Sequence, residues 1–201
     1  MRPMQRRRLL LLSVPALAGM GAPLWAAAAD STVKVERRGD AVVVDVERDV
    51  PAPLADTWAV LTDFDHMAAF MTGVKSSKVV GRDGNTLELA QTARAGFAFV
   101  HFEFASLRAV ELLPMQEIRT RLISGDFVSY DSTTKLSDRG AGTRLVYHGV
   151  YVPKRWMPPL VGTSAMEAET RRQYDQLVAE VLRRRTPGRE MKPLPAAAGS
   201  R

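Results

Sequence analysis

The stretch from Asp49 to Val80 constrains the fold of this chain more than any other part of the sequence. A valine-rich run stops at Pro51, and the next residues place Trp58 and Leu61 on one face of a short helix. A second short apolar pattern with helical spacing ends at Gly73. The sequence therefore predicts a strand, two small helices and a further strand in succession.

Turn-forming residues divide most of the remaining chain into strands. The clearest turn signal is Asp83-Gly84, a dipeptide typical of tight hairpins, and Ala95-Gly96 is predicted to break the chain before the next strand. The predicted strands are Val42–Val50, Val74–Gly81, Thr86–Arg94, Phe97–Arg108, Gln116–Ile123, Phe127–Leu136 and Thr143–Val152, with Val33–Arg37 as an additional candidate. Short turns between consecutive strands favour an antiparallel sheet.

The alternation within these strands indicates a sheet with one covered face and one wet face. Ile118 and Thr120 alternate with Arg119 and Arg121, which predicts that both arginines point outward. The segment Phe97–Phe104 instead carries aromatic residues at both parities. This pattern is typical of a central strand, a bulge or an additional contact on the outer face.

The longest predicted helix runs from about Leu160 to Arg185. Apolar residues recur along it at helical spacing, Glu167 lies early, and a basic triplet, residues 183–185, lies at its end, as the helix dipole favours. This helix is long enough to cover the concave face of the predicted sheet.

Three segments carry a family resemblance: V-P-A-P, then W-A-V-L-T-D-F-D-H-M-A-A-F-M, and later G-T-R-L-V-Y-H-G-V-Y-V-P before the closing helix. Together, over about Val42 to Arg184, they resemble the polyketide cyclase/coenzyme Q-binding branch of the START-like (SRPBCC) superfamily. The resemblance implies an α+β helix-grip fold, with a curved seven-stranded antiparallel sheet around a long C-terminal helix and two short helices after the first strand. It also implies a cavity for a hydrophobic small molecule such as a lipid, quinone, sterol or polyketide.

Aromatic and methionine residues are the candidates for the wall of such a cavity. They are Phe70, Met71, Phe99, Phe102, Phe104, Tyr130, Tyr147, Tyr151, Met166 and Tyr174. A solidly packed core made of the same residues is the alternative, because aromatic side chains are usually buried in any fold.

Catalytic and metal-binding groups are sparse. The resemblance carries no shared catalytic motif, so no catalytic residue is assigned; the tyrosines with Glu103 or Arg144 are the conceivable acid–base pairs. His101, Glu103 and His148 would need to converge to hold a metal, and solvated histidines are the expectation. We predict no metal and no cofactor.

The first 29 residues have the three parts of a secretory signal peptide: an arginine-rich head, an apolar run and an A-x-A site before Asp30. We expect cleavage near Ala29 and a periplasmic protein; an uncleaved membrane anchor is the alternative. Four of the six net positive charges lie in this segment, so the remainder carries no strongly basic footprint for nucleic acid. Residues 30–185 are the predicted domain, and the proline-rich residues 186–201 are a predicted disordered tail.

The function predicted from these features is binding, and carriage, of a hydrophobic small molecule by an exported domain. A polyketide cyclase or dehydratase is one alternative, although export argues against it. A protein-interaction module with a filled core is the other. Transient contact with a membrane surface is conceivable through residues 183–185 and the apolar turn at residues 156–161. The sequence does not determine the oligomeric state.

Overall fold

The computed structural model describes residues 31–97, 100–154 and 162–185, which form one antiparallel sheet and four helical segments. The strands are β1 Ser31–Arg38, β2 Ala41–Val50, β3 Val74–Asp83, β4 Thr86–Phe97, β5 Val100–Leu113, β6 Glu117–Gly125, β7 Phe127–Asp138 and β8 Thr143–Pro153. The helices are α1 Leu54–Leu61, the 3-10 turn η1 Phe64–His66, α2 Met67–Phe70 and α3 Thr163–Arg185.

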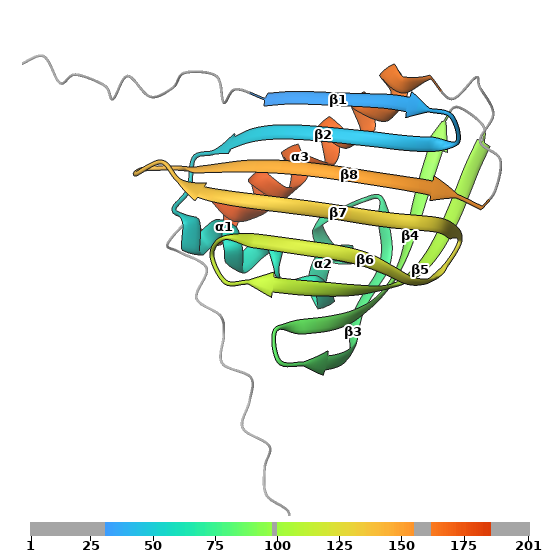
Figure 1. The fold of residues 1–201 in the computed structure, drawn as a ribbon. Helices are drawn as coiled ribbons and strands as arrows, with labels where there is room; N and C mark the ends of the chain where they lie inside the picture. Colours follow the sequence, from blue (N-terminus) through green and yellow to red (C-terminus); the bar gives the residue numbers. More distant parts are fainter. Residues whose placement is uncertain (1–30, 98–99, 155–161, 186–201) are drawn as a thin grey trace, which may run out of the picture.

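The strand order is β1-β2-β8-β7-β6-β5-β4-β3, with every neighbouring pair antiparallel. After β2 the chain crosses through α1, η1 and α2 to the opposite edge of the sheet, where it enters β3. It then returns strand by strand until β8 pairs with β2. The sheet curves, and α3 runs along its concave side (Figure 1).

This arrangement confirms the helix-grip fold and corrects the number of strands from seven to eight. The additional strand is β1, which forms because Val33 and Val35 are buried together with Met166 of α3. The short helices consequently follow the second strand. The expected break at Ala95-Gly96 is also wrong: β4 continues to Phe97, with Ala95 paired to Phe102 and Gly96 paired to His101.

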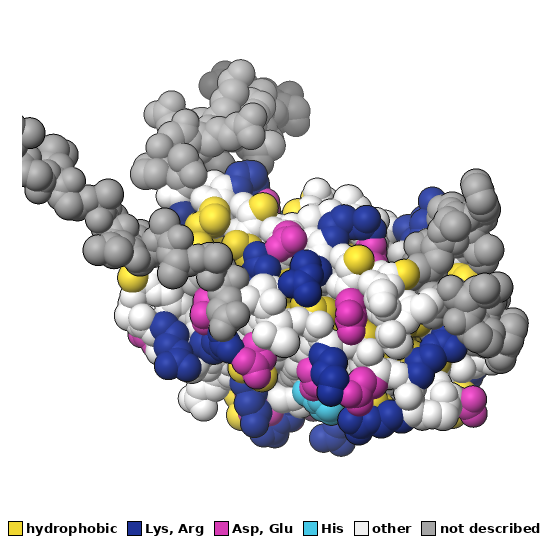
Figure 2. Space-filling view, turned by 90° about the horizontal axis from the view of Figure 1, so that it is seen from above, with side chains coloured by type: hydrophobic (Ala, Val, Ile, Leu, Met, Phe, Trp, Pro, Cys, Tyr) yellow, Lys and Arg dark blue, Asp and Glu magenta, His cyan; other side chains and the backbone are white. Residues whose placement is uncertain are grey.

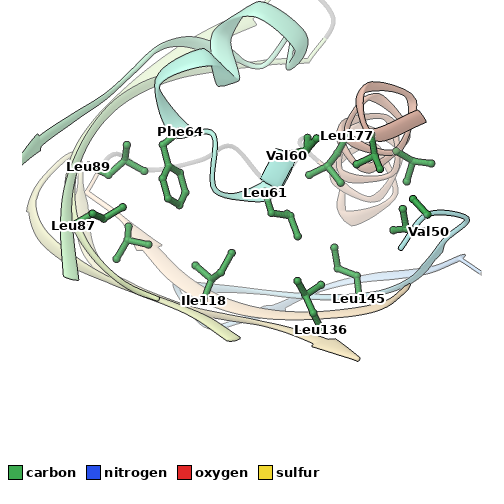
Figure 3. Close-up of a cluster of buried hydrophobic side chains, with 14 residues drawn as sticks. Val50, Val60, Leu61, Phe64, Leu87, Leu89, Ile118, Leu136, Leu145 and Leu177 are labelled. Carbon is green, nitrogen blue, oxygen red and sulfur yellow. The ribbon is translucent and has the colours of Figure 1, made fainter. Parts of the chain in front are cut away.

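The main hydrophobic core fills one end of the curved sheet. Side chains from α1, η1 and the C-terminal half of α3 meet apolar side chains of the sheet there, and Figure 3 shows them converging on one interior. The cluster includes Val50, Val60, Leu61, Phe64, Leu87, Leu89, Val110, Ile118, Leu136, Leu145, Leu177, Val178 and Val181. Burial of this set fixes the C-terminal half of α3 against the sheet.

Ion pairs hold the same end of α3 in place. Arg184 contacts Asp63 beside η1 at 2.8 Å, and Arg185 contacts Asp56 of α1 at 3.2 Å. Glu180, which is buried, accepts hydrogen bonds from the guanidinium groups of Arg183 and Arg184. The basic triplet is therefore engaged within the molecule. On the face seen from above in Figure 2, basic and acidic side chains are interspersed.

We predict that Glu180 makes the stability of the protein depend on acidic pH. Hydrogen bonds from Arg183 and then Arg184 lower the pKa of Glu180 from 4.5 to about 2, against the opposing effect of burial. A carboxyl group with a lowered pKa stabilises the fold above its unfolded pKa, and this contribution disappears as the pH falls from 4.5 towards 2. The shift corresponds to about 3 kcal/mol.

Glu180→Gln should therefore weaken the dependence of the unfolding free energy on pH in that window, as measured by urea denaturation at a series of pH values. Glu88→Gln, at an exposed carboxylate of β4, is the matched control and should change stability by less than about 0.5 kcal/mol. An equal pH dependence in wild type and Glu180→Gln would contradict the assignment.

Candidate functional site

The size of the inward-facing side chains changes along the strands, and this change leaves a cavity. At the core end these positions hold leucine, isoleucine and valine, whereas further along β4 to β7 they hold small residues. The small ones are Ala93, Ser106, Thr120 and Ser132. Because they do not reach the N-terminal half of α3, a cavity of about 360 Å³ remains between sheet and helix. This volume lies within the range of roughly 300–1,000 Å³ that is typical of ligand sites.

Residues from the helices close the other side of this cavity. Leu61, Phe64, Met67 and Met71 contribute from α1 to the end of α2. Thr170, Gln173, Tyr174 and Leu177 contribute from α3. The wall of the cavity is therefore mixed. It is apolar on the side of α1 and α2, and it carries hydroxyl and amide groups on the side of the sheet.

Six of the ten side chains predicted from the sequence lie on this wall. They are Met71, Phe104, Tyr130, Tyr147, Tyr151 and Tyr174. Phe99 lies outside the described residues.

The other three are not among the residues that line the cavity. The Phe70 ring packs against the guanidinium of Arg184, whose Cζ lies 5.6 Å from the centre of the Phe70 ring. Phe102 contacts the Phe104 ring. Met166 of α3 is buried against the valines of β1 and β2. These positions share helix or strand patterns with the wall residues, and only the packing of the elements separates the two groups.

Aromatic rings form a continuous wall near the start of β7 and the end of β8. The Phe127 ring stacks on Phe104 at 5.5 Å and meets Tyr130 edge-on at 5.6 Å. Tyr130 in turn stacks on Tyr151 at 5.9 Å, between ring centres. Such rings provide flat apolar surface together with polar edges. Phe127 was not predicted as a wall residue.

Arg108 of β5 is the one basic side chain of the wall that is almost fully buried, with 8% of its surface exposed, among the residues that the structure describes. Its guanidinium lies 5.1 Å from the centre of the Tyr130 ring and donates a hydrogen bond from Nη2 to Gln91 Oε1. Its Nε is buried without a hydrogen-bond partner in the described structure. A buried guanidinium that lines a cavity and is paired with an amide instead of a carboxylate is suited to bind an oxygen atom.

Gln91 orients this arginine. The Gln91 amide donates from Nε2 to Ser77 Oγ at 3.2 Å and contacts Met67 Sδ at 3.7 Å, which turns its carbonyl oxygen towards Arg108. Sequence reasoning missed both residues. The available signal was parity: Phe104, Ser106, Arg108 and Val110 occupy alternating positions of one strand, so a charge stands on the covered face.

The tyrosine hydroxyls are neutral hydrogen-bonding groups. Tyr130 Oη and Tyr147 Oη lie 3.4 Å apart. Burial raises the pKa values of Tyr147 and Tyr174 above the ordinary value, and burial raises the pKa of Tyr151 to about 12. These phenols stay protonated near neutral pH, so each can donate a hydrogen bond into the cavity.

The acidic and imidazole groups that the sequence offered for catalysis lie away from this wall. Glu103 pairs with Lys75 at 2.6 Å, and His148 pairs with Asp45 at 2.6 Å on the exposed face of the sheet. Arg144 contacts Asp49 at 3.1 Å. The side chain of His101 lies outside the described residues. Among described wall residues none is Asp, Glu or His, and the same part of the chain holds no cluster of three such groups placed for a metal.

The geometry thus defines a partly open, mainly apolar site with one buried cation and several hydroxyl groups. Comparison of sequences places this site in a family: the model of the polyketide cyclase / dehydrase and lipid transport family matches residues 41–182. The match covers more than half of the chain, and the chain therefore belongs to this family. No curated protein matches the sequence.

Solved structures share the fold at low sequence identity. A protein from Thermus thermophilus gives a TM-score of 0.61 at 23% identity, over 72% of this chain and 99% of that protein. The Zhui aromatase/cyclase from Streptomyces sp. R1128 gives 0.56 at 17% identity, over 73% and 97%. A STAR-related lipid transfer protein from Xanthomonas axonopodis gives 0.56 at 10% identity, over 75% and 98%. These similarities confirm the START-like fold, which by itself supports more than one activity.

We predict that most of the tyrosines of this chain resist ionisation. All four tyrosines line the cavity, and three of them, Tyr147, Tyr151 and Tyr174, have raised pKa values. In the folded protein these three phenols should remain protonated at pH 10, which is the ordinary pKa of tyrosine. In denaturant their ionisation should have its midpoint near pH 10. Tyrosinate absorbance measured against pH tests this expectation.

The same shifts predict a loss of stability in alkali. Because the folded protein retains protons that the unfolded chain releases, the unfolding free energy is unaffected by these groups below pH 10 and falls as the pH rises above it. An ionisation midpoint near pH 10 for all the tyrosines, with native circular dichroism, would show that the phenols are open to solvent.

Proposed function

We propose that this domain binds a small hydrophobic molecule in the cavity and holds an oxygen atom of that molecule against Arg108. The ligand class is a lipid-, quinone- or polyketide-like compound of modest size. Apolar surface that leaves water contributes affinity of about 25 cal/mol per Å², and the few polar groups of the wall set the orientation.

The observation that carries this proposal is the position of Arg108. Removal of a guanidinium from water is costly, and a buried cation in a packed core normally has a carboxylate partner. Arg108 has an amide and an aromatic ring instead, and it lines the cavity. An oxygen atom of a bound ligand would give the guanidinium a polar partner in place of a carboxylate.

The cavity bears on the two alternatives. A protein-interaction module with a filled core is disfavoured by a cavity of about 360 Å³ between the sheet and the helices. A cyclase or dehydratase needs a group that accepts a proton from carbon, and the described wall offers protonated phenols and arginines. Neutral phenols and a cation bind and polarise a carbonyl oxygen, which favours binding over proton abstraction.

Export and carriage belong to the same proposal. Residues 1–29, the predicted signal peptide, and residues 186–201, the predicted tail, lie outside the described residues. Support for export comes from the basic head, apolar run and A-x-A site. An exported binding domain would move its ligand between sites in the cell envelope. Among described residues no helix has both the length and the apolarity to cross a membrane.

Ligand entry is proposed beside the end of α2. Thr72 follows α2 and is hydrogen-bonded to Gln176 of α3. The Thr72 amide donates to Gln176 Oε1 at 3.1 Å, and Gln176 Nε2 donates to Thr72 Oγ1 at 3.0 Å. Both are exposed and next to cavity residue Met71. Separation of this pair opens the wall without disturbing the main core. The apolar turn at residues 156–161 lies outside the described residues.

We predict that a bulky side chain on the cavity side of β7 abolishes ligand binding, whereas the same side chain on the opposite face does not. Thr134 lines the cavity, and its neighbour Thr133 faces outward between Arg119 and His148. Thr134→Phe should remove any ligand that copurifies with the full-length protein, as detected by native mass spectrometry before and after solvent extraction. Thr133→Phe should retain it. Equal occupancy in the two variants would contradict the enclosure of a ligand.

We predict that Arg108→Met weakens binding of the copurified ligand about 10- to 100-fold, because a hydrogen bond to a charged group contributes about 1.5–3 kcal/mol. Methionine keeps much of the volume and removes the charge. Arg119→Met, at an exposed arginine of the neighbouring strand, is the control. Rebinding to extracted protein, followed by calorimetry, measures the effect. Unchanged affinity in Arg108→Met would show that the guanidinium does not contact the ligand.

A further inference from the structure

Gly149 of β8 lies beneath the side chain of Tyr147. The two residues are separated by one position and therefore face the same side of the sheet. A Cβ atom at residue 149 would stand 2.7 Å from Tyr147 Cζ and 2.9 Å from Cε1, and closer still to Oη. Real Cβ atoms do not approach ring atoms this closely. Residue 149 is a glycine because a side chain would collide with the Tyr147 ring. Its backbone is not in the left-handed region, so backbone conformation does not require a glycine there.

The Tyr147 ring has little freedom to move elsewhere. It contacts the Tyr174 ring of α3, with ring centres 6.2 Å apart, and packs against both hydrophobic clusters. On the sheet, Gly149 is paired with Ser132, another residue of the cavity wall. The ring therefore lies along its own strand between the sheet and the cavity. Any side chain at residue 149 would push the ring into the cavity.

This position directs the Tyr147 hydroxyl at the Tyr130 hydroxyl. Their separation of 3.4 Å exceeds the usual 2.5–3.0 Å of a bond between hydroxyl groups, so the bond between them is weak. Both hydroxyls belong to cavity-lining residues. A carbonyl or hydroxyl oxygen of a bound molecule would accept a better hydrogen bond than the one the two phenols make with each other.

We propose that Gly149 is a positioning residue for Tyr147, and that the Tyr130–Tyr147 hydroxyl pair selects ring compounds bearing a ketone or phenol oxygen over the corresponding hydrocarbons. The selection rests on the proposed function, because it takes place in the same cavity. It adds to that function the chemical group that the ligand presents and the residue that fixes its recognition.

A pair of probes with one ring skeleton tests the selection. Fluorenone carries a ketone, and fluorene is the hydrocarbon without it. Affinities of extracted full-length protein for both are measured by calorimetry, and the ratio of the two affinities is compared between variants. Tyr147→Phe removes the hydroxyl and keeps the ring, so it should lower the fluorenone preference about 2- to 10-fold. Fluorene binding should remain unchanged.

A second pair of variants tests the role of Gly149. Gly149→Ala should lower the fluorenone preference to the level of Tyr147→Phe and also weaken fluorene, because the displaced ring occupies cavity volume. In the Tyr147→Phe background the same alanine should cause no further loss of preference, since the two residues act through one hydroxyl. Gly81→Ala is the matched control, because a Cβ in β3 meets only the side chain of Glu88.

Each outcome separates the selection from the proposed function. If wild type binds both probes and Tyr147→Phe has the same preference as wild type, the hydroxyl pair does not select and the cavity proposal stands. If Gly149→Ala keeps the wild-type preference, Gly149 does not position Tyr147. If wild type binds neither probe, the proposed function fails together with the selection. The Tyr147→Phe comparison decides the selection even where Gly149→Ala does not fold.

Discussion

The contact between the C-terminal half of α3 and one end of the curved sheet is the constraint on which the rest of this structure depends. Leucine and valine side chains of that half are buried against α1 and the sheet, and Arg184 and Arg185 tie its end to acidic residues near α1. With this end fixed, the distance between α3 and the concave face of the sheet is also fixed. The space under its N-terminal half is then decided by the side chains below.

Several of those side chains are small, so a cavity remains between the helix and the sheet. Ser106, Thr120 and Ser132 occupy positions that at the other end of the sheet are filled by residues such as Leu145. A fold that fills its core at one end and leaves it open at the other separates stability from binding. Substitutions in the cavity can alter a ligand preference, while the packed end maintains the fold.

The electrostatics of the cavity follow from burial. Burial raises the pKa values of Tyr147 and Tyr174, because the apolar surroundings disfavour a phenolate, and the Arg108 guanidinium adds a donor to the same wall. The result is a wall of donors: one charged group beside Gln91 and hydroxyls at Tyr130 and Tyr147. Gly149 adds a steric condition, because only a residue without a side chain leaves room for the Tyr147 ring.

The sequence by itself determined the class of fold, because alternation, turn residues and helical spacing are local properties. It predicted seven of the eight strands and the long helix, and it underrated β1, whose burial depends on contact with Met166 far along the chain. The sequence also named Tyr130, Tyr147 and Tyr151 as candidates for the cavity wall, and all three line the cavity. The tertiary structure decided which covered residues meet empty space and which meet one another. Phe70 and Met166 have the same local sequence character as the wall residues but pack elsewhere. Arg108 is recognised as a site residue only in the folded structure, where β5 places it beside Tyr130 without an acidic partner among the described residues. The physical reason is that a cavity is a property of the distances between elements, and no local pattern in the chain encodes those distances.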